Sequence, residues 1–237
     1  SEVSDIKKTS DMNKFYWMAI GLLLGLVNLR AEIKLPALVG DNMVLQQATK
    51  VRLWGNATPN SSLKVRSSWD NTEYTAQVND QGRWEIWVQT PSASFEKQQL
   101  TLENGQDKIV LHDLLIGEVW FGSGQSNMEL PVSRVTDMFR DEIAAYENTN
   151  IRQLKVPNIF NFHAPQTDLP DYVVWKPLTQ ESVMNFSALG YFFAKAMYEK
   201  NSIPVGLINS SWGGTPVEAW ISEEGLKEFP KYINDKR

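Results

Sequence analysis

The chain has 237 residues, of which 42% are hydrophobic and 22% charged, which is ordinary for a globular protein with room for one large domain or two small ones. Its net charge of −5 gives no basis for binding nucleic acid or an anionic membrane surface. The absence of cysteine excludes disulfides and thiolate chemistry, and the two histidines stand far apart, which argues against a metal centre. We therefore expect neither a metal ion nor an organic cofactor.

The N-terminal segment, residues 1–31, has the pattern of a signal peptide. Lys14 precedes an apolar run at 15–27, and Ala31 offers a small residue for cleavage. The run is shorter than the roughly 20 residues that a membrane-spanning helix needs. We expect the rest of the protein to be exported to the periplasm or outside the cell, without stable membrane association after cleavage. An uncleaved anchor or a buried helix is the alternative.

Residues 32–112 are predicted to form a small antiparallel β-sandwich region. Apolar and polar residues alternate in runs such as KVRLWG, SLKVRS and RWEIWVQ, and turns rich in Gly, Asn and Asp separate these runs. Trp84 and Trp87 fall on opposite faces of the last of these predicted strands. One of the two tryptophans is therefore expected to be exposed.

From residue 113 onward the pattern changes to that of a parallel α/β sheet. The apolar run 114–121 is typical of a strand buried on both faces, and 151–156 and 205–209 are further strand candidates. The segment SALGYFFAKAMYEKN has apolar residues at helical spacing and begins at Ser187, a reasonable N-cap. A strand, a helix and a strand in this order favour a right-handed crossover between parallel strands.

Two polar, glycine-containing loops follow two of the predicted strands, GSGQSNMELP at 122–131 and NSSWGGT at 209–215. Sites in parallel sheets lie outside the carboxyl ends of the strands, so we expect both loops on one edge. Ser126 is a candidate nucleophile, because a serine just after a buried strand can place its own N–H beside a developing oxyanion. A simple Ser/Asn turn is the alternative, and the pattern alone does not choose Ser126 over Ser123.

The segment 117–131 resembles the first conserved block of SGNH-type carbohydrate esterases, and more specifically that of the sialate O-acetylesterase family. Further segments resemble that family in the same order along the chain: 35–47, 51–57, 185–197 and 206–220. The resemblance therefore covers nearly the whole chain after the predicted leader.

This resemblance implies an SGNH-hydrolase domain in residues 113–237, with a flavodoxin-like, three-layer α/β/α fold, preceded by the β-sandwich region. Ser126 matches the family's nucleophile. Gly190 lies in a block that lends a backbone N–H to the oxyanion hole, although a purely conformational role for this glycine is the alternative.

Residues of the two polar loops are expected to bind the substrate: Gln125, Asn127, Trp212, Gly213 and Gly214. Trp212 could stack on a sugar ring or serve only in packing. The two glycines match a loop that shapes the family's pocket, and plain turn geometry is the alternative for both.

The later blocks of the family, which carry an oxyanion asparagine and an Asp-x-x-His-like pair, are absent from this sequence. His112 ends an apparent strand and His163 lies in a loop, so both are predicted to be structural or on the surface. Glu118 and Glu129 flank the nucleophile loop and are predicted to be structural or solvated. Because no base is present to activate Ser126, we expect the chain to be the N-terminal, truncated part of a longer enzyme, with little esterase activity alone.

Three functions remain open. The first is a serine esterase that removes O-acetyl groups from sugars, with sialic acid as the first candidate substrate. The second is an acetylesterase acting on polysaccharides such as xylan, and the third is a secreted glycan-binding module without catalytic activity. The sequence does not indicate an oligomeric state.

Overall fold

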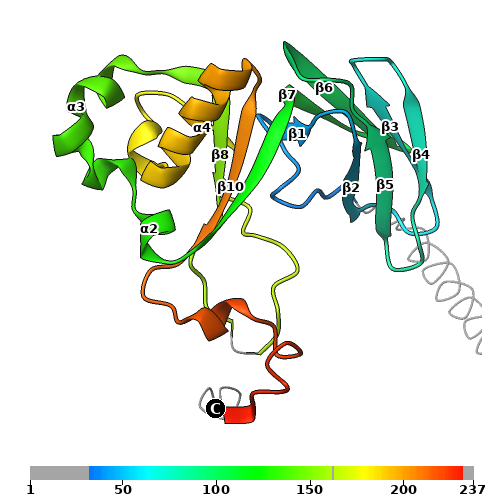
Figure 1. Cartoon of the computed structure of the whole chain (residues 1–237). Helices are drawn as coiled ribbons and strands as arrows, with labels where there is room; N and C mark the ends of the chain where they lie inside the picture. Colours follow the sequence, from blue (N-terminus) through cyan, green and yellow to red (C-terminus); the bar gives the residue numbers. More distant parts are fainter. Residues whose placement is uncertain (1–31, 162, 232–237) are drawn as a thin grey trace, which may run out of the picture. The chain divides into compact units, whose positions relative to one another are not determined.

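The computed structural model describes residues 32–161 and 163–231, so the predicted leader lies outside the described residues (Figure 1). Strands make up the first part of this region: β1 (Val44–Gln46), β2 (Lys50–Asn56), β3 (Ser62–Ser67), β4 (Glu73–Gln77), β5 (Arg83–Gln89) and β6 (Ser94–Asn104). The second part mixes strands with helices: β7 (Asp107–Gly124), α2 (Ser126–Glu129), η1 (Val132–Arg134), α3 (Thr136–Ala145), β8 (Asn148–Lys155), β9 (Lys176–Leu178), η2 (Val183–Asn185), α4 (Ala188–Asn201), β10 (Val205–Ser211) and η3 (Val217–Trp220). No helix among the described residues is long and apolar enough to cross a membrane.

One mixed sheet connects the two parts of the described chain. Its strands follow the order β4-β3-β6-β7-β10-β8-β9, and β1 also pairs with β7. The pairs β3–β4, β3–β6 and β6–β7 are antiparallel, whereas β7–β10 and β10–β8 are parallel. The sheet therefore changes from antiparallel to parallel pairing at β7, and β2 and β5 form a separate antiparallel pair.

The antiparallel part has the alternating burial that its sequence predicts. Leu63 and Val65 on β3 are fully buried, and Leu53 on β2 and Trp84 on β5 belong to the same apolar core. Each such side chain contributes on the order of 2 kcal/mol by leaving water. Trp84 is 3% exposed and Trp87 is 54% exposed, which confirms that the two tryptophans lie on opposite faces.

Strand β7 runs through the boundary that the sequence predicts between residues 112 and 113. Asp113 has a φ of 55°, and the pairing of β7 with β6 is irregular close to this residue. The buried Arg152 of β8 donates hydrogen bonds to the Asp113 carbonyl and, at 2.7 Å, to its Oδ1. Burial alone would raise the pKa of Asp113, but hydrogen bonds from Lys97 and Arg152 hold that pKa below its usual value. This cluster joins the antiparallel and parallel parts.

Helices α3 and α4 pack on one face of the parallel strands (Figure 1). Ser187 caps α4 as predicted, and Tyr191 in its first turn shares a core with Leu207 of β10. The opposite face is covered by the core that contains Val173 and Trp175. The described residues thus provide one helical layer over these strands, and the second layer of the predicted three-layer arrangement is not among them.

Candidate active site

The two polar loops lie side by side, as the sequence predicts. Strands β7 and β10 pair in parallel up to their last residues, where Ser211 is opposite Gly124. The N–H of Trp212 then donates to the Gly124 carbonyl at 2.9 Å. The chain turns out of β7 at Gly124, whose φ of 137° is a conformation that favours glycine.

Ser126 is exposed at the start of α2, immediately after this turn. A Cβ added to Gly213 would lie 3.7 Å from the Ser126 Cβ, so the backbone of the second loop passes directly beside the serine. Among the hydrogen bonds of the described residues, neither the Ser126 hydroxyl nor its N–H has a partner. Both groups are therefore available to a ligand. Gln125 and Asn127 flank the serine and are exposed as well.

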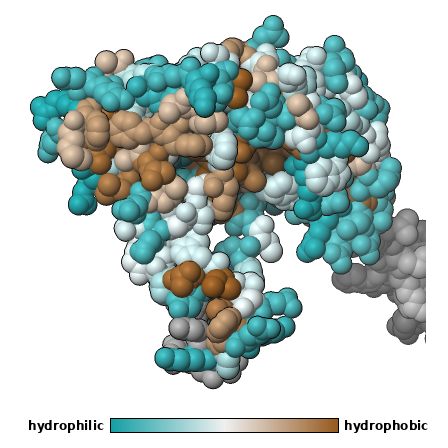
Figure 2. All heavy atoms as spheres, viewed as in Figure 1, coloured by the Kyte–Doolittle hydropathy of each residue, from teal (hydrophilic) through white to brown (hydrophobic). Residues whose placement is uncertain are grey.

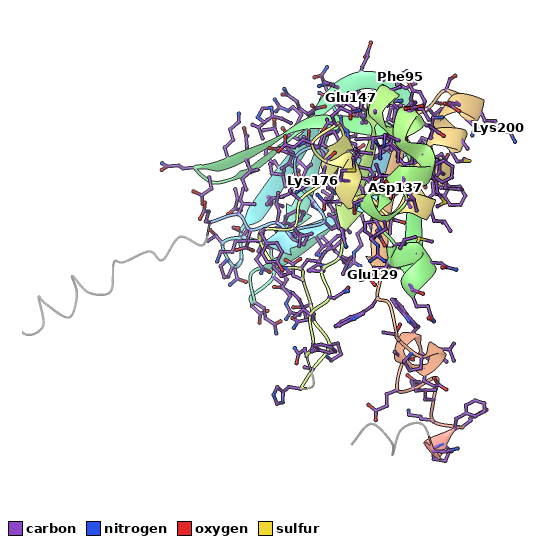
Figure 3. All side chains as sticks on the ribbon, turned by 90° about the vertical axis from the view of Figure 1, so that its left-hand side faces the viewer. Phe95, Glu129, Asp137, Glu147, Lys176 and Lys200 are labelled. Carbon is purple, nitrogen blue, oxygen red and sulfur yellow. The ribbon has the colours of Figure 1, made fainter. Side chains whose placement is uncertain are left out.

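Glu129, at the end of α2, connects three loops. Its Oε2 accepts the Gly213 N–H at 2.5 Å, and its Oε1 accepts Nδ2 of Asn158 at 2.7 Å. Figure 3 shows Glu129 near the lower end of the sheet, above the segment that follows β10. Of the two roles that the sequence left open for this glutamate, structural or solvated, the hydrogen bonds support the structural one, and its partners are 29 and 84 positions away in the sequence.

Glu118 has a separate structural role on β7. Its carboxylate accepts Nε2 of Gln47 at 2.7 Å and Nε2 of Gln46 at 3.2 Å, which fastens the end of β1 to β7. Glu118 and Glu129 therefore have different amide partners, and each carboxylate holds backbone elements together.

A cavity of about 560 Å³ lies beside the serine, between the loops that follow β8 and β10. It has aromatic walls, since the rings of Phe160 and Trp212 lie 4.4 Å apart between centroids and Trp220 lines it too. Trp220 is held by a 2.9 Å hydrogen bond from its Nε1 to Oγ1 of Thr215. Figure 2 shows hydrophobic atoms on the surface of the segment that follows β10, where Val217 is 69% exposed.

A second cavity of about 390 Å³ opens between the end of β8 and β9. Lys155 and Lys176 line it together with amide and hydroxyl side chains, and no carboxylate is among its lining residues in the described part of the chain. Pro157 and Asn158 line both cavities. The loop after β8 thus separates an aromatic cavity from a cationic one.

Gly190 requires a correction. It lies in the first turn of α4, where its N–H donates to the Ser187 hydroxyl at 3.0 Å. This hydrogen bond caps the helix, and it occupies the donor that an oxyanion would need. We therefore do not assign the oxyanion hole to Gly190.

Neither histidine has a hydrogen bond to Ser126 among the described residues. His112 lies on β7 in the antiparallel part, where its N–H donates to Oδ1 of Asp41 at 2.7 Å. The N–H of His163 donates to Oδ1 of Asn161 at 2.9 Å, and neither histidine lines either cavity. The described part of the chain also contains no cluster of His, Asp and Glu that could hold a metal ion.

The family model described as carbohydrate esterase, sialic acid-specific acetylesterase, matches residues 117–236, which is just over half of the chain. The chain belongs to this family. The match begins on β7 and includes Ser126, the Gly213 loop and both cavities.

Named relatives and a solved structure agree with this membership of the carbohydrate esterases. The chain is 31% identical to sialate O-acetylesterase of Homo sapiens, over 89% of this chain and 44% of the relative, and 28% identical to that of Rattus norvegicus, over 88% and 42%. The crystal structure of a carbohydrate acetylesterase from Xanthomonas citri superposes with a TM-score of 0.76 at 31% identity, covering 83% of this chain and 44% of that one. The chain therefore spans less than half the length of these relatives.

Proposed function

We propose that the full-length protein is a serine esterase that hydrolyses O-acetyl esters on sugars. The observation that carries this proposal is an exposed serine just after the carboxyl end of β7, close to the backbone of Gly213, which lines an aromatic cavity. Membership of the carbohydrate esterase family supports the same chemistry.

In this mechanism Oγ of Ser126 attacks the acetyl carbonyl carbon. A histidine from outside the described residues, oriented by an aspartate, takes the hydroxyl proton as the new C–O bond forms. The Ser126 N–H donates to the negative oxygen, and one such donor lowers the barrier by roughly 3 kcal/mol. The sugar oxygen leaves with the proton from the histidine, and water then hydrolyses the acetyl-serine to release acetate.

The aromatic cavity suits the sugar. Trp212 and Phe160 line it, and aromatic rings pack well against the C–H groups of a sugar ring. We assign the amide side chains of Gln125 and Asn127 to polar contacts with the substrate. Gly213 and Gly214 carry no side chain that would keep the ester away from Ser126.

The preferred substrate in this proposal is an O-acetylated sialic acid. Sialic acid carries a carboxylate, and Lys155 and Lys176 line a cavity without acidic residues, among those described, next to the aromatic one. A neutral polysaccharide such as acetylated xylan would offer these lysines no charged partner. A glycan-binding role without catalysis is the alternative, and it is favoured because no histidine among the described residues lines either cavity.

Acetate release from O-acetylated sialic acid by the full-length protein tests the proposal, with the Ser126→Ala variant as comparison. We expect release by the parent and at least a thousandfold less by the variant, on the order of 4 kcal/mol in activation free energy. Equal rates would refute the role of Ser126.

A panel containing acetylated xylan then separates the substrates. Charge neutralisation in Lys155→Gln with Lys176→Gln should raise KM for the acidic sugar and leave hydrolysis of a neutral acetyl ester unchanged. Equal effects on both substrates would remove the argument for sialic acid.

A further inference from the structure

Glu129 is three residues after the proposed nucleophile and has no place in the chemistry described so far. Its carboxylate is half-buried and accepts two N–H donors from two different loops, at 2.5 Å from Gly213 and 2.7 Å from Asn158. Hydrogen bonds to a charged acceptor are about twice as strong as those between neutral groups. The link between the three loops is therefore a strong one.

The space around Gly213 is adapted to this link. A Cβ added at Gly213 would lie 2.6 Å from Oε2 of Glu129, closer than to any atom of Ser126. A side chain here would push the carboxylate away before it touched the serine. The missing side chain therefore leaves room for the Glu129 carboxylate, whereas the distances to Ser126, 3.6 and 3.7 Å, are those of ordinary contacts.

The two partners of Glu129 belong to the walls of the cavities. Gly213 lines the aromatic cavity, and Asn158 lines both the aromatic and the cationic one. Through them, Glu129 fixes the distance between the Ser126 turn and the loops that would hold the sugar. A displacement of about 1 Å between a nucleophile and its substrate can cost a hundredfold in rate.

From this geometry we infer that Glu129 is a positioning residue, whose carboxylate ties the nucleophile turn to the two substrate-holding loops. The inference rests on the proposed esterase function. It assigns no proton transfer to Glu129, because both oxygens already accept N–H groups from Gly213 and Asn158.

The test uses an exchange of hydrogen-bonding groups in the full-length protein. Glu129→Met keeps the length of the side chain but removes both acceptors, so the N–H groups of Gly213 and Asn158 lose their partner. Asn158→Asp alone places two carboxylates against each other. In the double variant Glu129→Gln with Asn158→Asp, the amide carbonyl at position 129 accepts from Gly213, and the NH₂ at that position donates to the carboxylate introduced at position 158. Both hydrogen bonds are thus restored, with the negative charge moved from one side chain to its partner.

We expect each single variant to lower kcat by about 10- to 100-fold with a smaller change in KM, and the double variant to recover most of the loss. Glu118→Met is the matched control, since it also removes the acceptor of two amide hydrogen bonds but lies outside the site. It should leave kcat per folded molecule unchanged. Unchanged kcat in Glu129→Met, or a double variant as slow as the single ones, would overturn the inference.

Hydrogen exchange at the Gly213 amide gives a readout that does not depend on activity. This N–H should exchange about tenfold more slowly in the parent and in the double variant than in Glu129→Met. If the parent releases no acetate but shows this protection, the esterase proposal fails and the link stands. If Gly213 exchanges equally fast in all variants, the link itself is refuted.

Discussion

The two halves of β7 lie in different surroundings. In its first half Leu111 and Leu114 are buried, and the strand pairs in antiparallel with β6, in regular register up to Leu111 and with shifted register beyond it. In its second half the strand pairs in parallel with β10, Phe121 is 65% exposed, and the chain continues into an exposed polar turn. The first half holds the two parts of the sheet together, and the second presents chemical groups at an open end. Substitutions in the first half should therefore change the free energy of unfolding, and substitutions at the end of the second half should change the catalytic rate.

The largest effect on activity is expected at Ser126, in the turn that follows the second half of β7. Ser126→Ala should abolish activity of the full-length protein, by at least about a thousandfold, because the attacking oxygen is removed. The free energy of unfolding should change by less than about 0.5 kcal/mol, since the side chain is exposed and makes no hydrogen bond among the described residues. Urea denaturation beside an acetate assay checks both. A large loss of stability would show that this turn is part of the core instead.

The converse effect, on stability and not on activity, is expected at the Asp113–Arg152 cluster. Arg152→Met should lower the free energy of unfolding by about 3 kcal/mol, because the Asp113 and Thr149 carbonyls lose a buried donor. Once folded, the variant should retain the kcat of the parent. A variant with parental stability but impaired kcat would contradict this division between the two halves.

A smaller effect is expected from Gly213→Ala, which should reduce kcat about tenfold because the new methyl group displaces the Glu129 carboxylate. Gly214→Ala is the matched comparison. It strains a residue with a φ of 77° at a cost of about 1 kcal/mol but meets no atom within 4 Å, so its kcat should fall less. Steady-state kinetics of both variants checks this order. A larger fall of kcat in Gly214→Ala than in Gly213→Ala would contradict the prediction.

The smallest effect concerns pH. The pKa of Asp113 is lower in the folded protein than in the unfolded chain, so its contribution to stability is present above the unfolded value and is lost as pH falls through the folded one. Stability should therefore decrease below about pH 4, the ordinary range of an aspartate. Asp113→Asn should flatten this decrease in urea titrations at several pH values. An identical pH profile in parent and variant would mean that other carboxylates dominate.

Local patterns in the sequence predict much of this arrangement. The Ser187 cap, the parallel strands and the neighbouring polar loops each follow from short-range signals, and the structure confirms them. The sequence did not predict that β7 continues through Asp113, because the buried partner that stabilises this irregular position, Arg152, is 39 residues away. The continuation of β7 through Asp113 thus depends on tertiary contacts.

The site shows the same limit. Gly190 matches a family block, but its N–H has a local partner in Ser187, and a helix cap satisfies that donor at once. Glu129 was predicted to be structural or solvated, and its partners depend on two loops that only the sheet brings together. A motif identified Ser126 as a candidate, whereas the groups that hold it in place could be found only in three dimensions.

The central claim is that Ser126 is the nucleophile, and covalent labelling tests it most directly. The full-length protein can be treated with a fluorophosphonate, which reacts with activated serine hydroxyls, and the labelled residue located by peptide mass spectrometry. We predict a single label on Ser126, prevented by prior incubation with an O-acetylated sugar. A label on Ser123 instead, or acetate release by a protein whose Ser126 stays unlabelled, would contradict the account.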